Sequence, residues 1–321
     1  MERQTSLRWI AAQQQPSKPA EGAARDALCH AVWGGSLSPA QFIERESRLW
    51  LQPFSQRGLR LWLLSQGDAV LASCETYAVA CRADGKSGVA HGVASVFVED
   101  RLRGQGHASA LLRGVHAQLQ REGSLCTYLM SEVDPGIYAR LGYVERRVRA
   151  RRYAAQLSAP CPNVDWLRLD QLDDSLSTDA GDGLSLSLSL SIDADFVRWH
   201  IARGAYHAQV LGLPRQIFLG PRVGKTWALC ADDPAEGLLR VLVLRSDGDP
   251  QALRDVLLAV RHMAAQQGLP TVELWENEGM RHLPFAAADI AQDLDVVPML
   301  RPLSSGIDAH AWQSCERGHW I

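Results

Sequence analysis

The sequence predicts an α/β (α+β) fold in which a mixed, mostly antiparallel sheet is flanked by helices and followed by a second, degenerate copy of the same unit. The length of 321 residues is enough for two domains of ordinary size. Apolar strand patterns before residue 98 are joined by hairpin turns such as Asp84-Gly85. An amphipathic helix and a further strand follow, and the order of three strands, a helix and a strand recurs after residue 215.

The elements of the first half follow from periodicity and capping signals. The second helix begins with a capping box formed by Ser38, Pro39 and Gln41. Gly123 ends the helix expected over residues 107–122. The expected helices are 21–33, 38–50, 107–122 and 135–141, and the expected strands are 59–64, 70–82, 93–98, 125–130 and 143–153.

Four segments are predicted along the chain. Residues 1–20 are polar with two prolines and are expected to be a flexible arm, and residues 21–158 form the first domain. Residues 159–192 are expected to be a linker with a low-complexity insert, because the repeated Leu-Ser of 173–192 could alternate as a strand but has the composition of an insert. Residues 193–321 form the second domain, with helices at 195–210 and 249–267 and strands near 216–219, 225–231, 239–245 and 271–276.

Composition excludes several classes of protein. The chain is 46% hydrophobic and 21% charged with a net charge of -3, so no basic excess favours nucleic-acid binding. No run approaches the ~18 apolar residues of a membrane span, and the N-terminus lacks the apolar core of a signal peptide. The seven cysteines form no CxxC pair, and no metal-ligand spacing occurs. We therefore expect a metal-free protein of the reducing cytoplasm, without membrane or nucleic-acid partners.

Residues 91–112 (HGVASVFVEDRLRGQGHASALL) lead from a strand through a glycine-rich turn into a helix. Unpaired backbone N–H groups and the positive end of the helix dipole meet there, which suits a pyrophosphate. Gly104 and Gly106 allow the backbone to approach that group, and Arg101 and Arg103 add positive charge. A Rossmann fingerprint begins in the same way, but Ser109 replaces its third glycine and antiparallel hairpins precede the turn.

Two motifs carry a resemblance to a known family. Arg101-Leu102-Arg103-Gly104-Gln105-Gly106 resembles the Arg/Gln-x-x-Gly-x-Gly/Ala signature of the GNAT superfamily of N-acetyltransferases. Ile137-Tyr138-Ala139-Arg140-Leu141-Gly142-Tyr143 resembles its aromatic-Tyr-x-x-x-Gly-aromatic segment, with Ile at the first place. The resemblance implies a GNAT-type sheet, a GNAT-like second domain without the CoA turn, and acetyl-CoA as co-substrate. The residues it implies for acetyl-CoA are Val96, Phe97, Val98, Arg103, Gly104, Gln105, Gly106, His107, Ala108 and Ser109.

Longer strings resemble the fungal lysine N6-acetyltransferases of lysine catabolism. They cover most of residues 29–145 and are patchier over 195–276. Examples are Ala31-Val-Trp-Gly34, Phe42-Ile-Glu-Arg-Glu46, Leu71-Ala-Ser-Cys-Glu-Thr-Tyr77 and His91-Gly-Val-Ala-Ser-Val-Phe97. The chain departs from that family at Val98-Glu99-Asp100, at Tyr143 and over residues 310–321, and these departures bear on the substrate.

The resemblance implies direct attack of an amine on acetyl-CoA in a ternary complex. A lysine ε-amine has a reference pKa of about 10.4 and must lose a proton to a carboxylate or histidine, directly or through water. Glu75 is the first candidate because it lies mid-strand among apolar residues, where burial would raise its pKa. A salt-bridged or surface glutamate is the alternative, and Asp134 and His91 are weaker candidates for the base.

The leaving thiolate needs a proton, and Tyr138 matches the position of the family's usual acid; a packing tyrosine is the alternative. A backbone N–H of residues 96–98 is expected to stabilise the oxyanion. Cys74 has no adjacent histidine to activate it, so covalent catalysis is not expected.

Tyr77, Trp199 and His200 are expected to line the acceptor site if the second domain covers the cleft; core packing is the alternative for Trp199 and His200. The predicted reaction is acetylation of a small-molecule primary amine, with the ε-amine of L-lysine as best candidate. Acetylation of a polyamine or an antibiotic and a non-catalytic acyl-CoA-binding module remain alternatives, and the oligomeric state stays open.

Overall fold

Helix signals in the sequence coincide with helices of the computed structural model, which describes residues 5–157, 163–177, 188–276, 280–286, 291–294, 296–312 and 315–320. Ser38 caps the second helix in the expected capping box: its Oγ accepts from the Gln41 N–H at 3.3 Å, and Gln41 Oε1 accepts from the Ser38 N–H at 2.9 Å. No helix in these described ranges is long and apolar enough to cross a membrane. The helices are α1 (Ala20–Trp33), α2 (Pro39–Trp50), α3 (Pro53–Gly58), α4 (His107–Arg121), α5 (Gly136–Ala139), α6 (Leu172–Ser177), α7 (Ala194–Leu211) and α8 (Pro250–Gln266).

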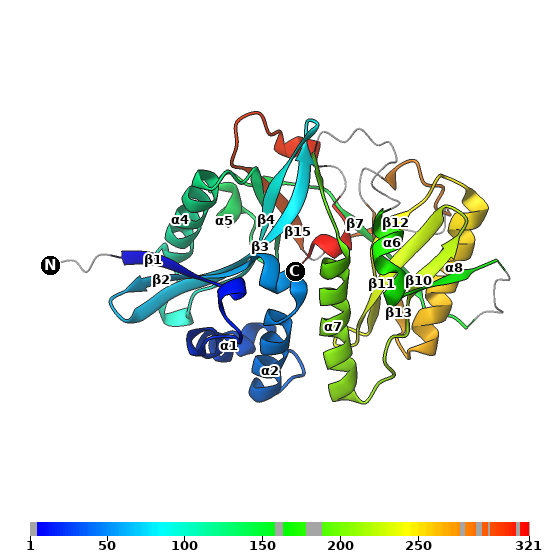
Figure 1. Cartoon of the computed structure of the whole chain (residues 1–321), viewed down its shortest axis with the longest axis horizontal. Coiled ribbons are helices and arrows are strands. Elements are labelled where there is room, and N and C mark those ends of the chain that lie inside the picture. The colour runs from blue at the N-terminus through cyan, green and yellow to red at the C-terminus, as the bar shows by residue number, and fades with distance from the viewer. Residues whose placement is uncertain are drawn as a thin grey trace.

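The strands form two sheets (Figure 1). The first contains β1 (Thr5–Ala11), β2 (Leu59–Gln66), β3 (Ala69–Ala83), β4 (Lys86–Phe97), β5 (Cys126–Ser131), β6 (Val144–Glu145), β9 (Leu188–Leu190) and β15 (Val297–Pro302). The second contains β7 (Arg149–Ala154), β8 (Asp165–Arg168), β10 (Phe218–Val223), β11 (Thr226–Asp233), β12 (Leu238–Arg245), β13 (Thr271–Glu276) and β14 (Ala291–Asp293). Their orders are β1-β2-β3-β4-β5-β15-β6, with β9 beside β3, and β14-β7-β13-β12-β11-β10-β8.

The predicted flexible arm is wrong over the residues that the structure describes. Strand β1 pairs antiparallel with β2, from Thr5 opposite Gln66 to Ala11 opposite Arg60. The Lys18 side chain is buried, with its Nζ 2.7 Å from Asp26 Oδ2. The polar composition of this segment concealed an edge strand, because one face of an edge strand can remain in water. The core of the predicted low-complexity insert, residues 178–187, lies outside the described residues, whereas its ends form α6 and β9.

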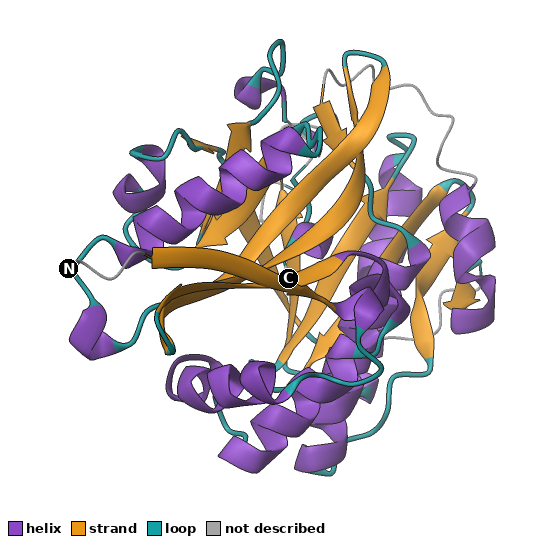
Figure 2. Cartoon of the chain, turned by 60° about the vertical axis from the view of Figure 1, so that its left-hand side comes forward, coloured by secondary structure: helices purple, strands orange, loops and turns teal. Residues whose placement is uncertain are grey.

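The internal repeat expected from element order is present in both sheets. In the first, β4 and β5 are parallel and α4 connects them; in the second, β12 and β13 are parallel and α8 connects them. The neighbouring pairs β2–β3, β3–β4, β10–β11 and β11–β12 are antiparallel. Figure 2 shows helices lying along the faces of the strands. The predicted mixed, mostly antiparallel sheet flanked by helices, with a degenerate second copy, is therefore confirmed.

Each half of the chain supplies a strand to the sheet of the other half. Strand β7 follows β6 by a few residues but pairs antiparallel with β13 in the second sheet. In return, β15 enters the first sheet between β5 and β6. The single strand predicted over 143–153 is thus two strands in different sheets, and the predicted ranges 21–158 and 193–321 do not coincide with the sheets. A strand pattern shows which residues are buried but not which open edge they will fill.

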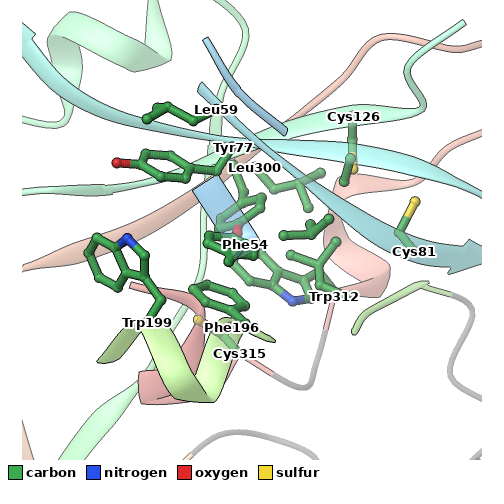
Figure 3. Close-up of a cluster of buried hydrophobic side chains, with 14 of the residues drawn as sticks. Phe54, Leu59, Tyr77, Cys81, Cys126, Phe196, Trp199, Leu300, Trp312 and Cys315 are labelled. Atoms are coloured by element: carbon green, nitrogen blue, oxygen red, sulfur yellow. The ribbon is translucent and has the colours of Figure 1, made fainter. Parts of the chain in front are cut away.

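Aromatic side chains from both halves form a shared core. Phe54 of α3 stacks between Tyr77 of β3 and Phe196 of α7, with ring centroids 5.6 and 4.2 Å apart (Figure 3). Leu300 of β15 and Trp312 belong to the same cluster and are fully buried. Helix α7 lies between the two sheets in Figure 1. This packing holds the second half against the open face of the first sheet and shapes the cavity between them.

Candidate active site

A cavity of about 690 Å³ lies between the first sheet and the second half of the chain. One side is lined by residues 92–96 of β4 and 128–130 of β5, together with Glu75 and Tyr77 of β3 and the α5 residue Tyr138. Helices α1 and α2 contribute a second wall, and α7, the β11–β12 loop and residues 317–320 contribute a third. The cavity therefore brings together the predicted acid and base with residues almost 250 positions away in the sequence.

Strands β4 and β5 separate at this cavity. They pair in parallel only between residues 90–92 and 126–128. Beyond that point β4 bulges against β3, with a register shift between Ser73 and Glu75, and Ser95 has a φ of +52°. Beyond residue 92, the edge of β4 that faces the cavity thus has no strand partner among the described residues, so its backbone can hydrogen-bond a bound acyl group.

Arg25 of α1 supports this bulge from behind. Its Nη2 donates to the Ser95 carbonyl at 2.7 Å, its Nε to Ser73 Oγ at 3.3 Å, and its Nη1 to Glu75 Oε1 at 3.3 Å. Arg25 is buried and also lines the cavity. Sequence analysis missed this residue because an arginine in the middle of a helix has no local signal that it is buried; only the packing of α1 on the sheet reveals it.

Glu75 is buried at the cavity wall, as its sequence context predicted. Besides Arg25, its carboxylate has Lys18 Nζ at 3.8 Å and accepts a hydrogen bond from the Tyr77 hydroxyl at 3.4 Å. The alternative of a salt-bridged glutamate thus matches its contacts, and its role as a base stays a prediction. Tyr77 and Trp199, both predicted acceptor-site residues, line the cavity with their rings edge to face at 6.1 Å.

Tyr138 lines the cavity and packs edge to face against Tyr143, with ring centroids 5.9 Å apart. Its hydroxyl has no hydrogen-bond partner among the described residues. Burial, with additional contributions from Cys74 and Glu132, raises the pKa of Tyr138 to about 12. The hydroxyl therefore holds its proton at neutral pH and can donate it to a base that forms in the cavity.

The other two predicted candidates for the base, His91 and Asp134, lie outside the cavity wall. His91 Nδ1 is 2.8 Å from Ser124 Oγ, and Asp134 accepts from the Gly136 N–H at 2.9 Å; neither residue lines the cavity. Glu46 and Glu132 do line it and were not predicted. Burial raises the pKa of the Cys74 thiol, which agrees with the expectation that this cysteine is no nucleophile.

The glycine-rich turn lies at the start of α4 and does not line the cavity. Gly104 and Gly106 have φ values of +76° and +82°, and no atom lies within 4 Å of the position of a Cβ on either residue. Gly106 is the N-cap of α4 and offers no side chain to its free N–H groups. Arg101 and Arg103, predicted to add positive charge, pair with Glu99 at 2.7 Å and Asp100 at 2.8 Å. No group of three or more potential metal ligands occurs in the described ranges.

The end of the cavity that is formed by the second half of the chain is rich in arginine. Arg152, Arg203, Arg240 and Arg317 line it, and Arg240 pairs with both Asp233 and Glu273. His200, predicted to line the acceptor site, is instead turned toward the C-terminal segment, where its Nε2 lies 3.1 Å from the Gly318 carbonyl. It does not line the main cavity, because its position on α7 is turned about 100° from that of Trp199.

The adjacent carboxylates of Asp232 and Asp233, near this end of the cavity, have pKa values shifted in opposite directions. Burial raises the pKa of Asp232 to about 7; for Asp233, burial acts in the same direction, but Arg203 and Arg240 lower the pKa to about 2. The raised pKa of Asp232 means that its contribution to stability is present below its usual value of 3.8 and is lost as the pH rises through 7. The lowered pKa of Asp233 has the opposite consequence, with stability lost as the pH falls toward 2.

Asp232→Asn is therefore expected to stabilise the fold relative to the parent, and by up to ~3 kcal/mol more at pH 8 than at pH 5. Asp233→Asn is the matched control and should destabilise it at both pH values, because it removes a partner of Arg240. Denaturant unfolding at pH 5 and pH 8 measures both effects. A destabilised Asp232→Asn at pH 8 would contradict the assignment of Asp232 as a buried acid whose Oδ1 has no hydrogen-bond partner among the described residues.

This chain is similar to known proteins in part of its sequence and in its fold. Residues 23–145 match a family model described as an acetyltransferase (GNAT) domain. The GCN5-related N-acetyltransferase from Anabaena variabilis is 12% identical with a TM-score of 0.57, over 93% of this chain and 73% of that chain. The GCN5-related N-acetyltransferase from Kribbella flavida is 18% identical with a TM-score of 0.53, over 93% and 72%. The tandem GNAT protein from the clavulanic acid biosynthesis pathway is 11% identical with a TM-score of 0.53, over 94% and 100%.

These likenesses show the fold, which is a two-domain GNAT arrangement whose N-terminal part matches the GNAT domain model. Among curated proteins no sequence match was found. The resemblance to fungal lysine N6-acetyltransferases consequently stays a prediction.

Proposed function

We propose that this chain is an acetyl-CoA-dependent N-acetyltransferase that acetylates a primary amine of a small molecule, with the ε-amine of L-lysine as the first candidate. One observation carries the proposal: the unpartnered edge of β4 and the protonated hydroxyl of Tyr138 face the same cavity. The GNAT domain over residues 23–145 supports acyl transfer as the reaction class.

Acetyl-CoA would bind along β4 and the start of α4. The left-handed turn at Gly104 and Gly106 exposes backbone N–H groups at the positive end of the α4 dipole, where a pyrophosphate is stabilised. Residues 103–109 are the proposed contacts for that group. Residues 96–98 lie between the turn and the cavity, so they are proposed to carry the pantetheine arm and to direct the thioester toward the opening beside β5.

The acceptor would enter from the side that faces the second half of the chain, between Tyr77 and Trp199. Its amine must be neutral to attack, and Glu75 is the proposed acceptor of the amine's proton, directly or through water. The C–N bond forms as the nitrogen lone pair attacks the thioester carbon, and the C–S bond breaks. Tyr138 then donates its proton to the departing thiolate, which yields the acetylated amine and CoA.

The test is release of CoA thiol from acetyl-CoA across L-lysine, other amino acids, polyamines and aminoglycosides. Gly106→Ala is expected to raise the KM for acetyl-CoA about 10-fold, because a Cβ at positive φ costs ~1–2 kcal/mol and projects from the turn. Gly123→Ala is the matched control: Gly123 has a φ of +84° and equally open space at the other end of α4, so it adds similar strain without contact with acetyl-CoA.

The outcomes separate the alternatives. Turnover on L-lysine supports the proposed acceptor, and turnover on another amine keeps the reaction and discards lysine. Binding of acetyl-CoA without turnover on any acceptor would instead indicate a non-catalytic acyl-CoA-binding module. Equal KM values for the two glycine variants would remove the proposed pyrophosphate site.

A further inference from the structure

We propose that Arg203 and Arg317 bind a carboxylate group of the acceptor, so that the substrate is an amino acid or a similar amine with an anionic group distant from its reacting nitrogen. The inference rests on the proposed function and deepens it by naming a substrate class and two residues that select it. It goes beyond the proposed pyrophosphate contacts of acetyl-CoA, which do not line this cavity.

The arginines at this end of the cavity outnumber the acids that pair with them. Arg240 pairs with Asp233 and Glu273, and Arg152 also pairs with Glu273, at 3.0 Å. Arg203 and Arg317 line the same space, and neither has a carboxylate within 4 Å among the described residues. Of the other acids in the lining, Glu46 pairs with Arg45 at 2.6 Å, and Glu236 is exposed and makes no ion pair with Arg203 or Arg317 among the described residues.

Unused hydrogen-bond donors lie beside these two cations. Among the described residues, neither the buried indole N–H of Trp199 nor the buried Nε of Arg317 has a hydrogen-bond acceptor. Trp199 and Arg203 are four residues apart on α7, so both side chains point from one face of the helix into the cavity. Arg317 uses Nη1 to contact the Trp320 carbonyl at 3.2 Å, and its guanidinium lies over the Trp320 ring at 4.4 Å. Donors and positive charge without acceptors define a site for an acceptor-rich anion.

This arrangement is costly without a ligand. Burial and the nearby charges of Arg240 and Arg203 lower the pKa of Arg317 well below its usual range. Burial and Arg45 likewise lower the pKa of Arg203, and the more distant carboxylates of Asp233 and Glu46 offset only part of that shift. A buried cation without a partner destabilises a fold, whereas an anion held by two guanidinium groups relieves both the desolvation and their mutual repulsion.

The position of Arg203 and Arg317 indicates that the anion they bind belongs to the acceptor and not to acetyl-CoA. The glycine-rich turn proposed for the CoA pyrophosphate does not line this cavity, so the arginines are not part of it. Glu75 and Tyr138 line the first-sheet side of the same cavity, where the amine would react. An acceptor that spans the space therefore places nitrogen at one end and carboxylate at the other, as a long-chain amino acid does.

The experiment compares acceptors that differ only in the carboxylate: 6-aminohexanoate against hexylamine, and L-lysine against cadaverine. The parent enzyme should prefer each carboxylate-bearing acceptor. Arg203→Gln should lower kcat/KM for these acceptors about 10- to 100-fold, the loss expected for a charge-assisted hydrogen bond, and leave the amines without a carboxylate unchanged. Arg203→Lys should recover part of the loss because it keeps the charge. Arg198→Gln is the matched control, since Arg198 is on the same helix but pairs with Asp173 and Asp195 outside the cavity.

Calorimetric titration of 6-aminohexanoate without acetyl-CoA separates this inference from the proposed function. Binding that Arg203→Gln weakens, combined with no turnover on any amine, would support the carboxylate site and reject the acetyltransferase. Turnover of hexylamine and cadaverine equal to that of their carboxylate-bearing counterparts would overturn the inference and leave the acetyltransferase intact. An unchanged preference for carboxylate-bearing acceptors in folded Arg203→Gln would also overturn it. The comparison of acceptors on the parent enzyme tests the inference even if the variant does not fold.

Discussion

Replacement of Tyr138 by phenylalanine is expected to lower kcat for acetyl transfer about 100-fold or more, the usual contribution of a positioned general acid. The hydroxyl lines the cavity, has no hydrogen-bond partner among the described residues, and keeps its proton because burial raises its pKa to about 12. Without it, the thiolate of CoA must leave unprotonated or wait for water. The KM for acetyl-CoA should change little, because the proposed pyrophosphate contacts lie at the glycine-rich turn. Steady-state kinetics with the best acceptor measure both constants.

Tyr143→Phe is the control for local packing. Its hydroxyl is buried and contacts His116 at 2.9 Å and Thr127 at 3.0 Å, while its ring packs against Tyr138. Loss of these hydrogen bonds should lower the melting temperature and leave kcat within about threefold, since it removes no proton donor from the cavity. If Tyr138→Phe retains the parent kcat, Tyr138 is a packing residue, and the proton must reach CoA by another route.

Leu300→Ala is expected to lower the free energy of unfolding by about 2–5 kcal/mol, the range for truncation of a buried leucine. Leu300 is 0% exposed, lies opposite Tyr128 of β5, and belongs to the core shared by both halves. Because β15 comes from the second half and completes the first sheet, the loss should destabilise both sheets together. Leu51→Ala is the control, since Leu51 is 51% exposed and its truncation should change stability by less than ~0.5 kcal/mol.

Denaturant unfolding followed by two probes tests this cooperativity. The exchange of β7 and β15 predicts a single transition for the secondary structure and for tryptophan fluorescence, shifted as a whole in Leu300→Ala. Two transitions, of which only one moves, would show that the halves unfold independently despite the exchanged strands.

Local signals in the sequence were sufficient for the elements whose conformation is decided within a few residues. The capping box at Ser38 and the turn at Gly104 and Gly106 are examples, because helix capping and positive φ depend on side chains and glycines close in sequence. The repeated order of three strands, a helix and a strand was predicted for the same reason, and with it the mixed sheet and its second copy. Tyr138 lies on the short helix that its motif predicted, and its role as the acid stays a prediction.

Other features depend on contacts between distant segments. The sequence pattern indicated that Glu75 and Trp199 are buried, but not that Glu75 has Arg25 and Lys18 beside it. His200 looked equivalent to Trp199 from its position next to it, yet a helix turns about 100° per residue, and His200 faces the C-terminal segment instead.

The sequence by itself determined where this chain forms its glycine-rich turn at Gly104 and Gly106 and caps its second helix, because those properties depend on neighbouring residues. Only the tertiary structure decided which edge β7 and β15 fill, and which charges meet in the cavity. The partner of each strand and the charged groups around Arg203 and Arg317 come from segments that are far apart in the chain. No local sequence pattern therefore predicts them. The proposed choice of acceptor therefore depends on the packing of the second half against the first.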